Sequence, residues 1–339
     1  MWYDPRITLS HNCLFNFVVG ARSAGKTFNT LTYCCDKFFK AAPDDPFEFA
    51  YIRRYKPEMK QTQEHLFDDL VANGYLENCK INTKNNPGLI NKKPIVNFFT
   101  LSTTAGMVKS VPYPNVKLIV FEEFLVNKGQ RYLPNEVDRF LELYVTIARN
   151  RDVPVLFLAN ATSQSNPYFL KFGIRPNGQE FQKIKNPDGS TDILLHTWRD
   201  AQQQEERKKS RFGSIIAGTT YEDYAVNNLY WYDDSSFIEK RDPQSTLKFL
   251  MYWNGKTYSV WSSLRKGKIW IDSSLNPPSA YTYCFTTDEQ KPNYLLARAF
   301  KTGGHFKLMQ SAQAQGCLYF NDINCKNAWF EMSRLINLT

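Results

Sequence analysis

The chain has 339 residues, of which 42% are hydrophobic and 15% aromatic, a composition that favours a globular protein over a disordered one. Its net charge of +9 favours an anionic partner such as nucleic acid. The seven cysteines include no C-x-x-C pair and the four histidines are scattered, so we expect reduced thiols rather than disulfides or a zinc site. The sequence has no signal-peptide pattern and no apolar run of about 18 residues, so it supports neither secretion nor membrane insertion.

The most specific short motif lies at residues 20–27, which read G-A-R-S-A-G-K-T. This is the G-x-x-x-x-G-K-[ST] pattern of a nucleotide-binding P-loop, and it stands between an apolar run and a segment with helical spacing. In such a loop the backbone N–H groups face a β-phosphate, the lysine reaches the β- and γ-phosphates, and the hydroxyl ligates Mg²⁺. The alternative is a glycine-containing turn before a core helix. The residues expected to bind ATP are Gly20, Ala21, Arg22, Ser23, Ala24, Gly25, Lys26 and Thr27, the last also as a metal ligand.

Apolar strands alternate with helical patterns over residues 14–200, which predicts an α/β domain with a central, mostly parallel sheet. The pattern at 134–148 has its apolar residues on one face, which is typical of a helix that packs on a sheet. The expected strands span 14–19, 47–53, 96–101, 116–121 and 153–159, and the expected helices span 25–41, 58–72, 134–148 and 164–172.

A second motif indicates ATP hydrolysis rather than nucleotide binding alone. The apolar strand at 116–121 runs into two carboxylates, Glu122 and Glu123, in a Walker B arrangement. We expect the first acid to orient the Mg²⁺ shell and the second to orient or deprotonate the attacking water. A kinase must exclude water and has little use for the second acid. The alternative is a pair of solvated carboxylates at a strand end.

Two more polar positions are candidates for the same site. Asn160 follows the strand at 153–159, where it would sense the γ-phosphate in an ATPase with an inserted central strand, or would instead cap the next helix. Arg149 and Arg151 follow the helix at 134–148. In a ring, an arginine at a subunit edge can enter the neighbouring site and stabilise transition-state charge. Arginines at a helix C-terminus are equally ordinary partners of the helix dipole.

The remainder of the chain has a different character. Residues 177–234 are polar and predict a linker or lid, with an exposed helix at 201–212. Residues 235–339 hold thirteen Lys and Arg against seven Asp and Glu, a net charge of +6. In this part, strands at 247–253, 257–262 and 268–272, joined by Asn254-Gly255 and Lys266-Gly267 turns, predict a three-stranded antiparallel meander.

These patterns divide the chain into three parts. We predict a P-loop ATPase domain at 1–200, a lid or linker at 201–234 and a smaller α+β domain at 235–339. The ATPase domain at 1–200 would belong to the class of P-loop ATPases that have an additional central strand and a catalytic glutamate (ASCE).

Several runs outside the Walker motifs resemble the DNA-packaging ATPases of phi29-type short-tailed phages. The most specific is Tyr51-Ile-Arg-Arg-Tyr-Lys-Pro-Glu58, which is far more specific than any Walker motif. The other runs follow the family's order, and the match weakens after residue 272. They are Phe17-Val-Val-Gly-Ala-Arg22, Tyr113-Pro-Asn-Val116, Pro134-Asn-Glu-Val137, Arg149-Asn-Arg151, Asn166-Pro-Tyr-Phe169, Arg211-Phe-Gly213 and Phe237-Ile-Glu-Lys240.

The resemblance implies a homo-oligomeric ring, pentameric in this family, that drives double-stranded DNA into an empty procapsid with ATP and Mg²⁺. It would work in the host cytoplasm, transiently at the portal vertex, with the portal and a structural RNA as candidate partners and no role for a membrane. By the same resemblance Arg149 is the arginine finger that acts in trans. Lys56 and Lys109 would face the neighbour's nucleotide, and Arg53 would lie on a strand end near the nucleotide.

The resemblance also indicates a DNA-binding loop after Walker B, with Lys128 and Arg131. These side chains would grip phosphates without reading bases, because a motor must move any sequence. The alternative is that both are solvated loop charges. Family members carry Asp-Glu where this chain has Glu122-Glu123, a departure that leaves open which carboxylate activates water. We assign Glu123, because the longer Glu122 can still reach a water of the Mg²⁺ shell.

The second domain resembles the RNase H-type nuclease domain of larger packaging motors, a fold that opens with three antiparallel strands. Such nucleases hold two metals through clustered acids. Here the strand at 247–253 carries no acid, and Asp272 stands alone at the end of the third strand. We therefore expect a nuclease-inactive domain whose charge suits DNA, a structural RNA or the portal.

Three other classes share part of this evidence. A helicase or another nucleic-acid-stimulated P-loop ATPase shares every core motif, and strand separation coupled to ATP would identify one. A P-loop kinase would tolerate the loss of Glu123. A non-catalytic structural or RNA-binding subunit is the remaining interpretation if Glu122 disables the site.

Overall fold

The computed structural model describes residues 2–103, 112–126, 132–160, 166–186, 188–200, 205–206, 208–216, 237–274, 277–279 and 281–338. No helix within these ranges is both long and apolar enough to cross a membrane. The contacts divide the chain into two compact units. The first comprises Met1–Pro167 and Gly173–Tyr232, and the second comprises Tyr168–Phe172 and Asp233–Thr339.

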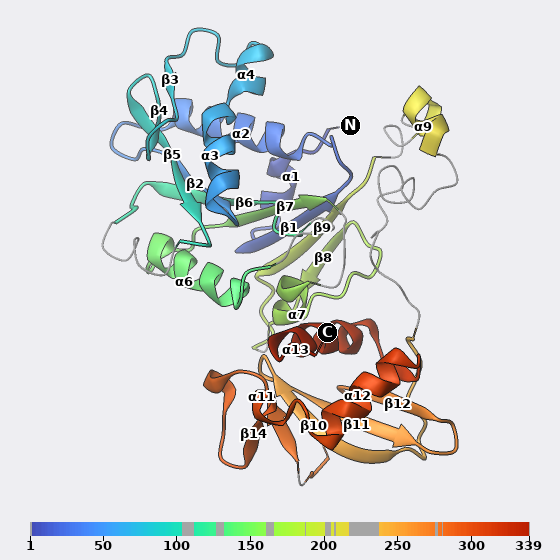
Figure 1. Cartoon of the computed structure of the whole chain (residues 1–339). Helices are drawn as coiled ribbons and strands as arrows, with labels where there is room; N and C mark the ends of the chain where they lie inside the picture. Colours follow the sequence, from blue (N-terminus) through green and yellow to red (C-terminus); the bar gives the residue numbers. More distant parts are fainter. Residues whose placement is uncertain are drawn as a thin grey trace. The chain divides into compact units, whose positions relative to one another are not determined.

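The first unit is built on a sheet in the order β3-β4-β5-β2-β6-β7-β1-β9-β8 (Figure 1). The strands from β5 to β9 in this order run parallel, and β3, β4 and β8 run antiparallel to their neighbours. Strand β7, which comes later in the chain, lies between β1 and β6. The bounds are β1 Phe15–Gly20, β2 Glu48–Arg53, β3 Ile81–Asn82, β4 Gly88–Ile90, β5 Lys93–Thr100, β6 Val116–Glu122, β7 Val155–Asn160, β8 Phe181–Ile184 and β9 Ile193–Trp198.

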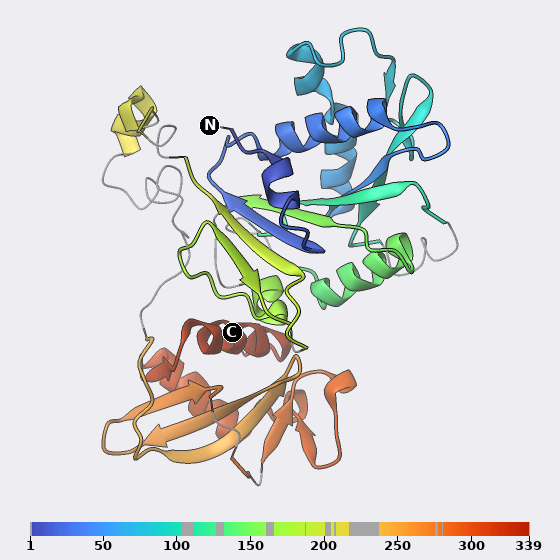
Figure 2. The same ribbon diagram turned by 180° about the vertical axis from the view of Figure 1, so that it is seen from behind.

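Helices cover both faces of this sheet, and Figure 2 shows them from behind. On one face, Leu31 of α2 and Met59 of α3 share a buried core with Val120 of β6. On the other face, Phe140 of α6 stacks on Phe121 with ring centroids 5.8 Å apart. The described helices of this unit are α1 Pro5–Leu9, α2 Lys26–Lys40, α3 Lys56–His65, α4 Asp68–Ala72, α6 Glu136–Ala148 and α9 Arg211–Ile216.

The five predicted strands of the first domain are confirmed with small shifts of their bounds, and so is the mixed α/β class with a parallel sheet. The single helix predicted at 58–72 is wrong, because α3 and α4 are separate. The buried side chains of Leu66 and Phe67 lie between them. Helix α3 begins earlier than predicted, since Glu58 accepts from the backbone N–H of Tyr55 at the helix start and proline is tolerated in a first turn.

The prediction that the chain turns to a linker or lid after residue 177 is wrong for β8 and β9. Strand β9 pairs with β1 in parallel, and all six of its residues are buried. Its apolar run is interrupted by His196 and Thr197, which hid it in the sequence. The helix predicted at 201–212 lies partly outside the described residues, and the helical segment α9 extends beyond it.

The second unit is built on a sheet in the order β14-β13-β10-β11-β12-β15. Strands β10, β11 and β12 form the predicted antiparallel meander, with Asn254 and Gly255 both at positive φ in the first turn. Helices α12 and α13 bury Phe306, Met309 and Trp329 against the sheet. The bounds are β10 Thr246–Trp253, β11 Lys256–Ser263, β12 Lys268–Asp272, β13 Thr282–Cys284, β14 Tyr294–Leu296, β15 Leu318–Phe320, α11 Ala297–Phe300, α12 Gly304–Ala314 and α13 Ile323–Leu335.

Helix α7, Pro167–Phe172, comes from the range predicted for the first domain, yet most of it belongs to the second unit. Leu170 is buried in the core of that unit. Lys171 Nζ donates to Asn254 Oδ1 at 2.8 Å, and Lys256 Nζ donates to the carbonyl of Leu170 at 3.3 Å. The second unit therefore includes a segment that precedes β8 and β9 in the chain.

His196 of β9 anchors the start of the chain to the sheet. Its Nδ1 lies 2.7 Å from Thr8 Oγ1, and the Thr8 hydroxyl lies 3.1 Å from that of Tyr3. Burial lowers the pKa of His196 to about 4, with a smaller contribution from His11, although Glu180 Oε1 lies 3.8 Å from Nε2. The folded protein therefore holds this imidazole neutral well below its ordinary pKa.

We predict that this histidine makes stability depend on pH. The unfolded chain protonates it near its ordinary pKa of 6.5 and the folded chain near 4, so stability is lost as pH falls between these values. Between pH 7 and pH 4.5 the free energy of unfolding should fall by about 2–3 kcal/mol less in His196→Asn than in the wild type. Urea unfolding at several pH values would measure it, with the exposed His65→Asn as the matched control. Parallel pH profiles for wild type and His196→Asn would contradict the assignment.

Candidate functional site

The residues of the P-loop, the two Walker B acids and Asn160 come together because neighbouring parallel strands end at one edge of the sheet, called here the carboxyl edge. Strand β1 ends at Gly20 beside Asn160, the last residue of β7. Strand β6 ends at Glu122, which lies opposite Leu158, two residues before the end of β7. Strand β2, the other neighbour of β6, ends at Arg53 close to Glu122. Ligands of open α/β sheets bind at this edge, where the strand order reverses.

The loop after β1 wraps around the lysine of the motif. Ser23 and Gly25 have φ of 54° and 75°, left-handed values that turn the chain into α2. Lys26 Nζ donates to the carbonyls of Gly20 at 3.0 Å and Ala21 at 2.7 Å, and to Asn160 Oδ1 at 3.3 Å. The ammonium therefore lies inside the loop and next to the end of the central strand.

Glu122 reaches from β6 to α2. The hydroxyl of Thr27 donates to Glu122 Oε1, and the hydroxyl of Tyr51 donates to Glu122 Oε2. Burial, followed by the charge of Glu122, raises the pKa of Tyr51, which therefore stays protonated and donates. Adjacent hydroxyl and carboxylate oxygens are the hard ligands that Mg²⁺ prefers, so Thr27 and Glu122 fit the predicted metal site.

Arg53 pairs with both Walker B acids. One guanidinium nitrogen lies 3.0 Å from Glu122 Oε2 and the other lies 3.0 Å from Glu123 Oε2. The Arg53 side chain is 12% exposed, and that of Glu123 is 40% exposed. Glu123 also has a φ of 55°, so the backbone turns directly after the strand. The two adjacent carboxylates thus point in different directions, Glu122 toward α2 and Glu123 toward solvent.

Arg54 fixes the loop after β6 from the opposite side. It forms a two-pronged ion pair with Glu136, at 2.7 and 2.9 Å, and both side chains are buried. It also donates to the carbonyls of Glu123 at 3.0 Å and Phe124 at 2.7 Å. Sequence reasoning missed Glu136, although it stands in the Pro-Asn-Glu-Val run, and it missed the contact of Tyr51 with Glu122.

An open pocket of 890 Å³ lies over the loop. It is lined by Arg22 to Thr27 of the loop, by both Walker B acids and by Asn160. Groups suited to phosphate, Mg²⁺ and water therefore share one cavity. Arg53 is not among the lining residues, since its guanidinium faces the carboxylates.

The remaining candidates lie elsewhere or outside the described residues. Lys56 is exposed on the first turn of α3 and does not line the pocket. Lys109, Lys128 and Arg131 lie outside the part of the chain that the structure describes.

The two arginines after α6 have different surroundings. Arg151 donates to four carbonyls, including that of Val116 at the start of β6. The turn after α6 therefore lies at the opposite edge of the sheet from the pocket. The six residues of β7 separate these two edges by about 20 Å. Arg149 is exposed, and nearby Val145 on α6 is 62% exposed.

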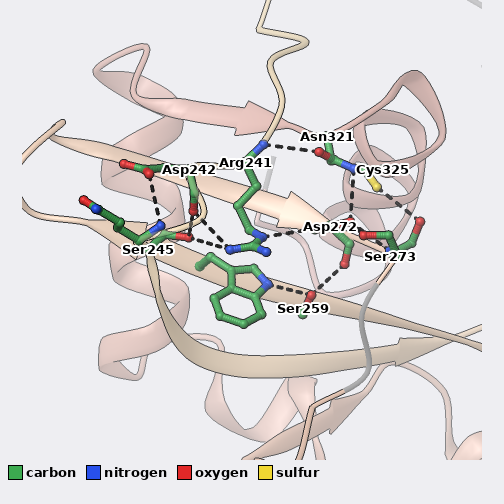
Figure 3. Close-up of polar contacts among 11 residues, drawn as sticks. Arg241, Asp242, Ser245, Ser259, Asp272, Ser273, Asn321 and Cys325 are labelled. Atoms are coloured by element: carbon green, nitrogen blue, oxygen red, sulfur yellow. Dashed lines mark hydrogen bonds and ion pairs between the residues drawn. The ribbon is translucent and has the colours of Figure 1, made fainter.

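In the second unit, Asp272 belongs to a buried polar network shown in Figure 3. It accepts from Arg241 Nε at 3.3 Å and from Asn321 Nδ2 at 3.2 Å, besides Ser274. The Arg241 guanidinium also lies 4.2 Å from the centre of the Trp261 ring. Within the described residues, no group of three or more His, Cys, Asp or Glu could hold a metal ion.

Comparison with known proteins gives consistent matches over the whole chain. The model of a family described as Podovirus DNA encapsidation protein (Gp16) matches residues 1–338. The DNA packaging protein of Bacillus phage phi29 is 33% identical over 340 residues, which cover 100% of this chain and 98% of that protein.

Solved structures agree. A chain of the bacteriophage Phi-29 viral genome packaging motor assembly aligns with a TM-score of 0.74 at 33% identity and covers 99% of both chains. The N-terminal domain of the DNA packaging ATPase from bacteriophage phi29 aligns with a TM-score of 0.51 at 33% identity, covering 59% of this chain and 97% of that one.

Proposed function

We propose a function for this chain, which belongs to the family of Podovirus DNA encapsidation proteins (Gp16). It is the ATP-hydrolysing subunit of a homo-oligomeric ring that moves double-stranded viral DNA into a procapsid. It would act in the host cytoplasm at the portal vertex. The observation that carries the proposal is that Lys26, Thr27, Glu122, Glu123 and Asn160 line one pocket at the carboxyl edge. The similarity to the phi29 packaging motor assembly supports the ring.

In the proposed reaction, the loop and Lys26 hold the β- and γ-phosphates of ATP. Thr27 and Glu122 would hold Mg²⁺, which when bound neutralises charge on the phosphate oxygens. Asn160, which already contacts Lys26, would sense the γ-phosphate. These groups bind and orient the phosphates and leave proton transfer to another side chain.

The division of work between the two acids is supported by their surroundings. Glu122 accepts from Thr27 and Tyr51 and pairs with Arg53, so its carboxylate is fixed beside α2. Glu123 is the more exposed acid and also lines the pocket. We therefore assign Glu123 as the base that orients or deprotonates the attacking water. Glu122 in place of the family's Asp is compatible with the metal role, because it reaches Thr27.

We predict that Glu123→Gln binds ATP and loses about 10²- to 10⁴-fold in turnover, because the amide cannot accept the proton of the attacking water. Equilibrium binding of ATP and steady-state phosphate release would measure the two effects. Glu64→Gln, at an exposed position of α3, is the matched control. Normal turnover in Glu123→Gln would overturn the assignment.

Arg149 is proposed as the arginine finger of the neighbouring subunit. Its turn lies about 20 Å from the pocket of its own chain along β7, which is too far for a side chain to reach. Arg151 is engaged with backbone carbonyls, whereas Arg149 is exposed beside an exposed apolar residue of α6. An exposed arginine next to apolar surface is suited to a subunit interface.

We predict that Arg149→Ala and Lys26→Ala subunits are each inactive alone and recover ATPase activity when mixed. In an equal mixture about a quarter of the interfaces would join an intact loop to an intact arginine. Mixing Lys26→Ala with Glu123→Gln is the control, because both changes lie on the same side of the interface and no intact site forms. Absence of rescue at every ratio would show that Arg149 does not act in trans.

The second unit is proposed to be an RNase H-like domain without nuclease chemistry. The antiparallel meander supports the fold, and the pairing of Asp272 with Arg241 rather than with another acid supports the loss of a metal site. Its net charge of +6 over 235–339 suits DNA, a structural RNA or the portal. Lys128 and Arg131 remain the proposed phosphate-gripping residues of the first domain, with Lys56 and Lys109 toward the neighbour's nucleotide.

A further inference from the structure

The P-loop pocket has a second side that the Walker motifs do not use. Besides the phosphate-binding groups, its lining includes Trp2, Phe28 and Tyr75, together with Asp69 and Asn73 of α4 and its C-cap. Trp2 is 60% exposed and Tyr75 is 58% exposed. Two large aromatic rings that remain this exposed at a pocket mouth indicate a ligand with a flat apolar face.

The position of Trp2 is fixed by the residues that follow it. The backbone N–H of Tyr3 donates to the carbonyl of Ala24 in the P-loop at 3.1 Å, and Asn29 Nδ2 donates to the carbonyl of Tyr3 at 2.7 Å. The Tyr3 side chain is fully buried and hydrogen-bonded to Thr8. The indole lies directly over the loop, because a Cβ built on Gly25 would come within 2.8 Å of its Cε3 atom.

Tyr75 reaches the same pocket from another segment. It follows Gly74, whose φ of 81° turns the chain after α4, and its N–H donates to the carbonyl of Leu70 at 3.0 Å. Its ring meets that of Phe28 edge to face, with centroids 5.7 Å apart and planes at 81°. Phe28 follows Thr27 directly, so this aromatic pair is joined to the phosphate-binding end of α2.

We propose that Trp2 and Tyr75 form the subsite that stacks on the base of a purine nucleoside triphosphate. The inference rests on the proposed function, in which the phosphates bind at the loop. A purine has two π-faces, and stacking on aromatic side chains is the common way to hold a base. The carboxylate of Asp69 and the amide of Asn73 line the same side and can pair with an exocyclic amino group of the ring.

The test compares ATP with inorganic tripolyphosphate, which has the phosphates but no base, as ligands of the full-length chain in Mg²⁺ by titration calorimetry. Trp2→Ala and Tyr75→Ala should each weaken ATP binding about 5- to 150-fold, the range measured for single stacked bases, and leave tripolyphosphate affinity unchanged. Trp2→Phe should retain most of the ATP affinity because it keeps a π-face. Phe39→Ala, at a 51% exposed aromatic residue that does not line the pocket, is the matched control.

The outcomes separate this subsite from the proposed function. Equal ATP affinity in wild type and both alanine variants would overturn the base subsite and leave the P-loop assignment intact. An equal loss for ATP and tripolyphosphate in Trp2→Ala would also overturn it, because the indole would then only shape the loop. If the wild-type chain binds neither ligand, both the nucleotide site and the subsite built on it are refuted.

Discussion

The forked contact of Arg53 with Glu122 and Glu123 is the interaction on which the rest of the site depends. Adjacent carboxylates repel one another, and this pair stands directly at the end of a largely buried strand. One guanidinium offsets the repulsion and separates the two side chains, since each carboxylate takes a different nitrogen. Arg53 and Glu122 come from neighbouring parallel strands, so the register of the sheet sets this geometry before any ligand enters.

The run from Tyr51 to Glu58 contributes more to the site than this one interaction. Side chains two residues apart in a strand share a face, which is why Tyr51 and Arg53 both reach Glu122. Arg54 points to the other face, where it joins the loop after β6 to Glu136 of α6. The backbone N–H of Tyr55 then donates to Glu58 where α3 begins. A single stretch of chain therefore fixes the acids, the loop behind them and the next helix.

Local patterns in the sequence were enough to predict the strands that carry the site and the edge at which its residues meet. The P-loop, the apolar strand that ends in two acids and the alternation of strands with helices can each be recognised within a short stretch of sequence. Long-range partners leave none. Strand β9 was missed because His196 interrupts its apolar run. The residue that binds His196, Thr8, lies far away in the chain. Glu136 and the exposed Trp2 were missed for the same reason, because only the fold brings them to Arg54 and to the P-loop.

The central claim is that the pocket at the carboxyl edge hydrolyses ATP in order to move duplex DNA. The rate of ATP hydrolysis by the wild-type chain, measured with and without double-stranded DNA of unrelated sequences, tests it most directly, with Lys26→Ala as the control for contaminating activity. The account predicts Mg²⁺-dependent hydrolysis that rises with DNA of any sequence and is lost in Lys26→Ala. Hydrolysis that duplex DNA leaves unchanged, or activity that persists without Lys26, would contradict it.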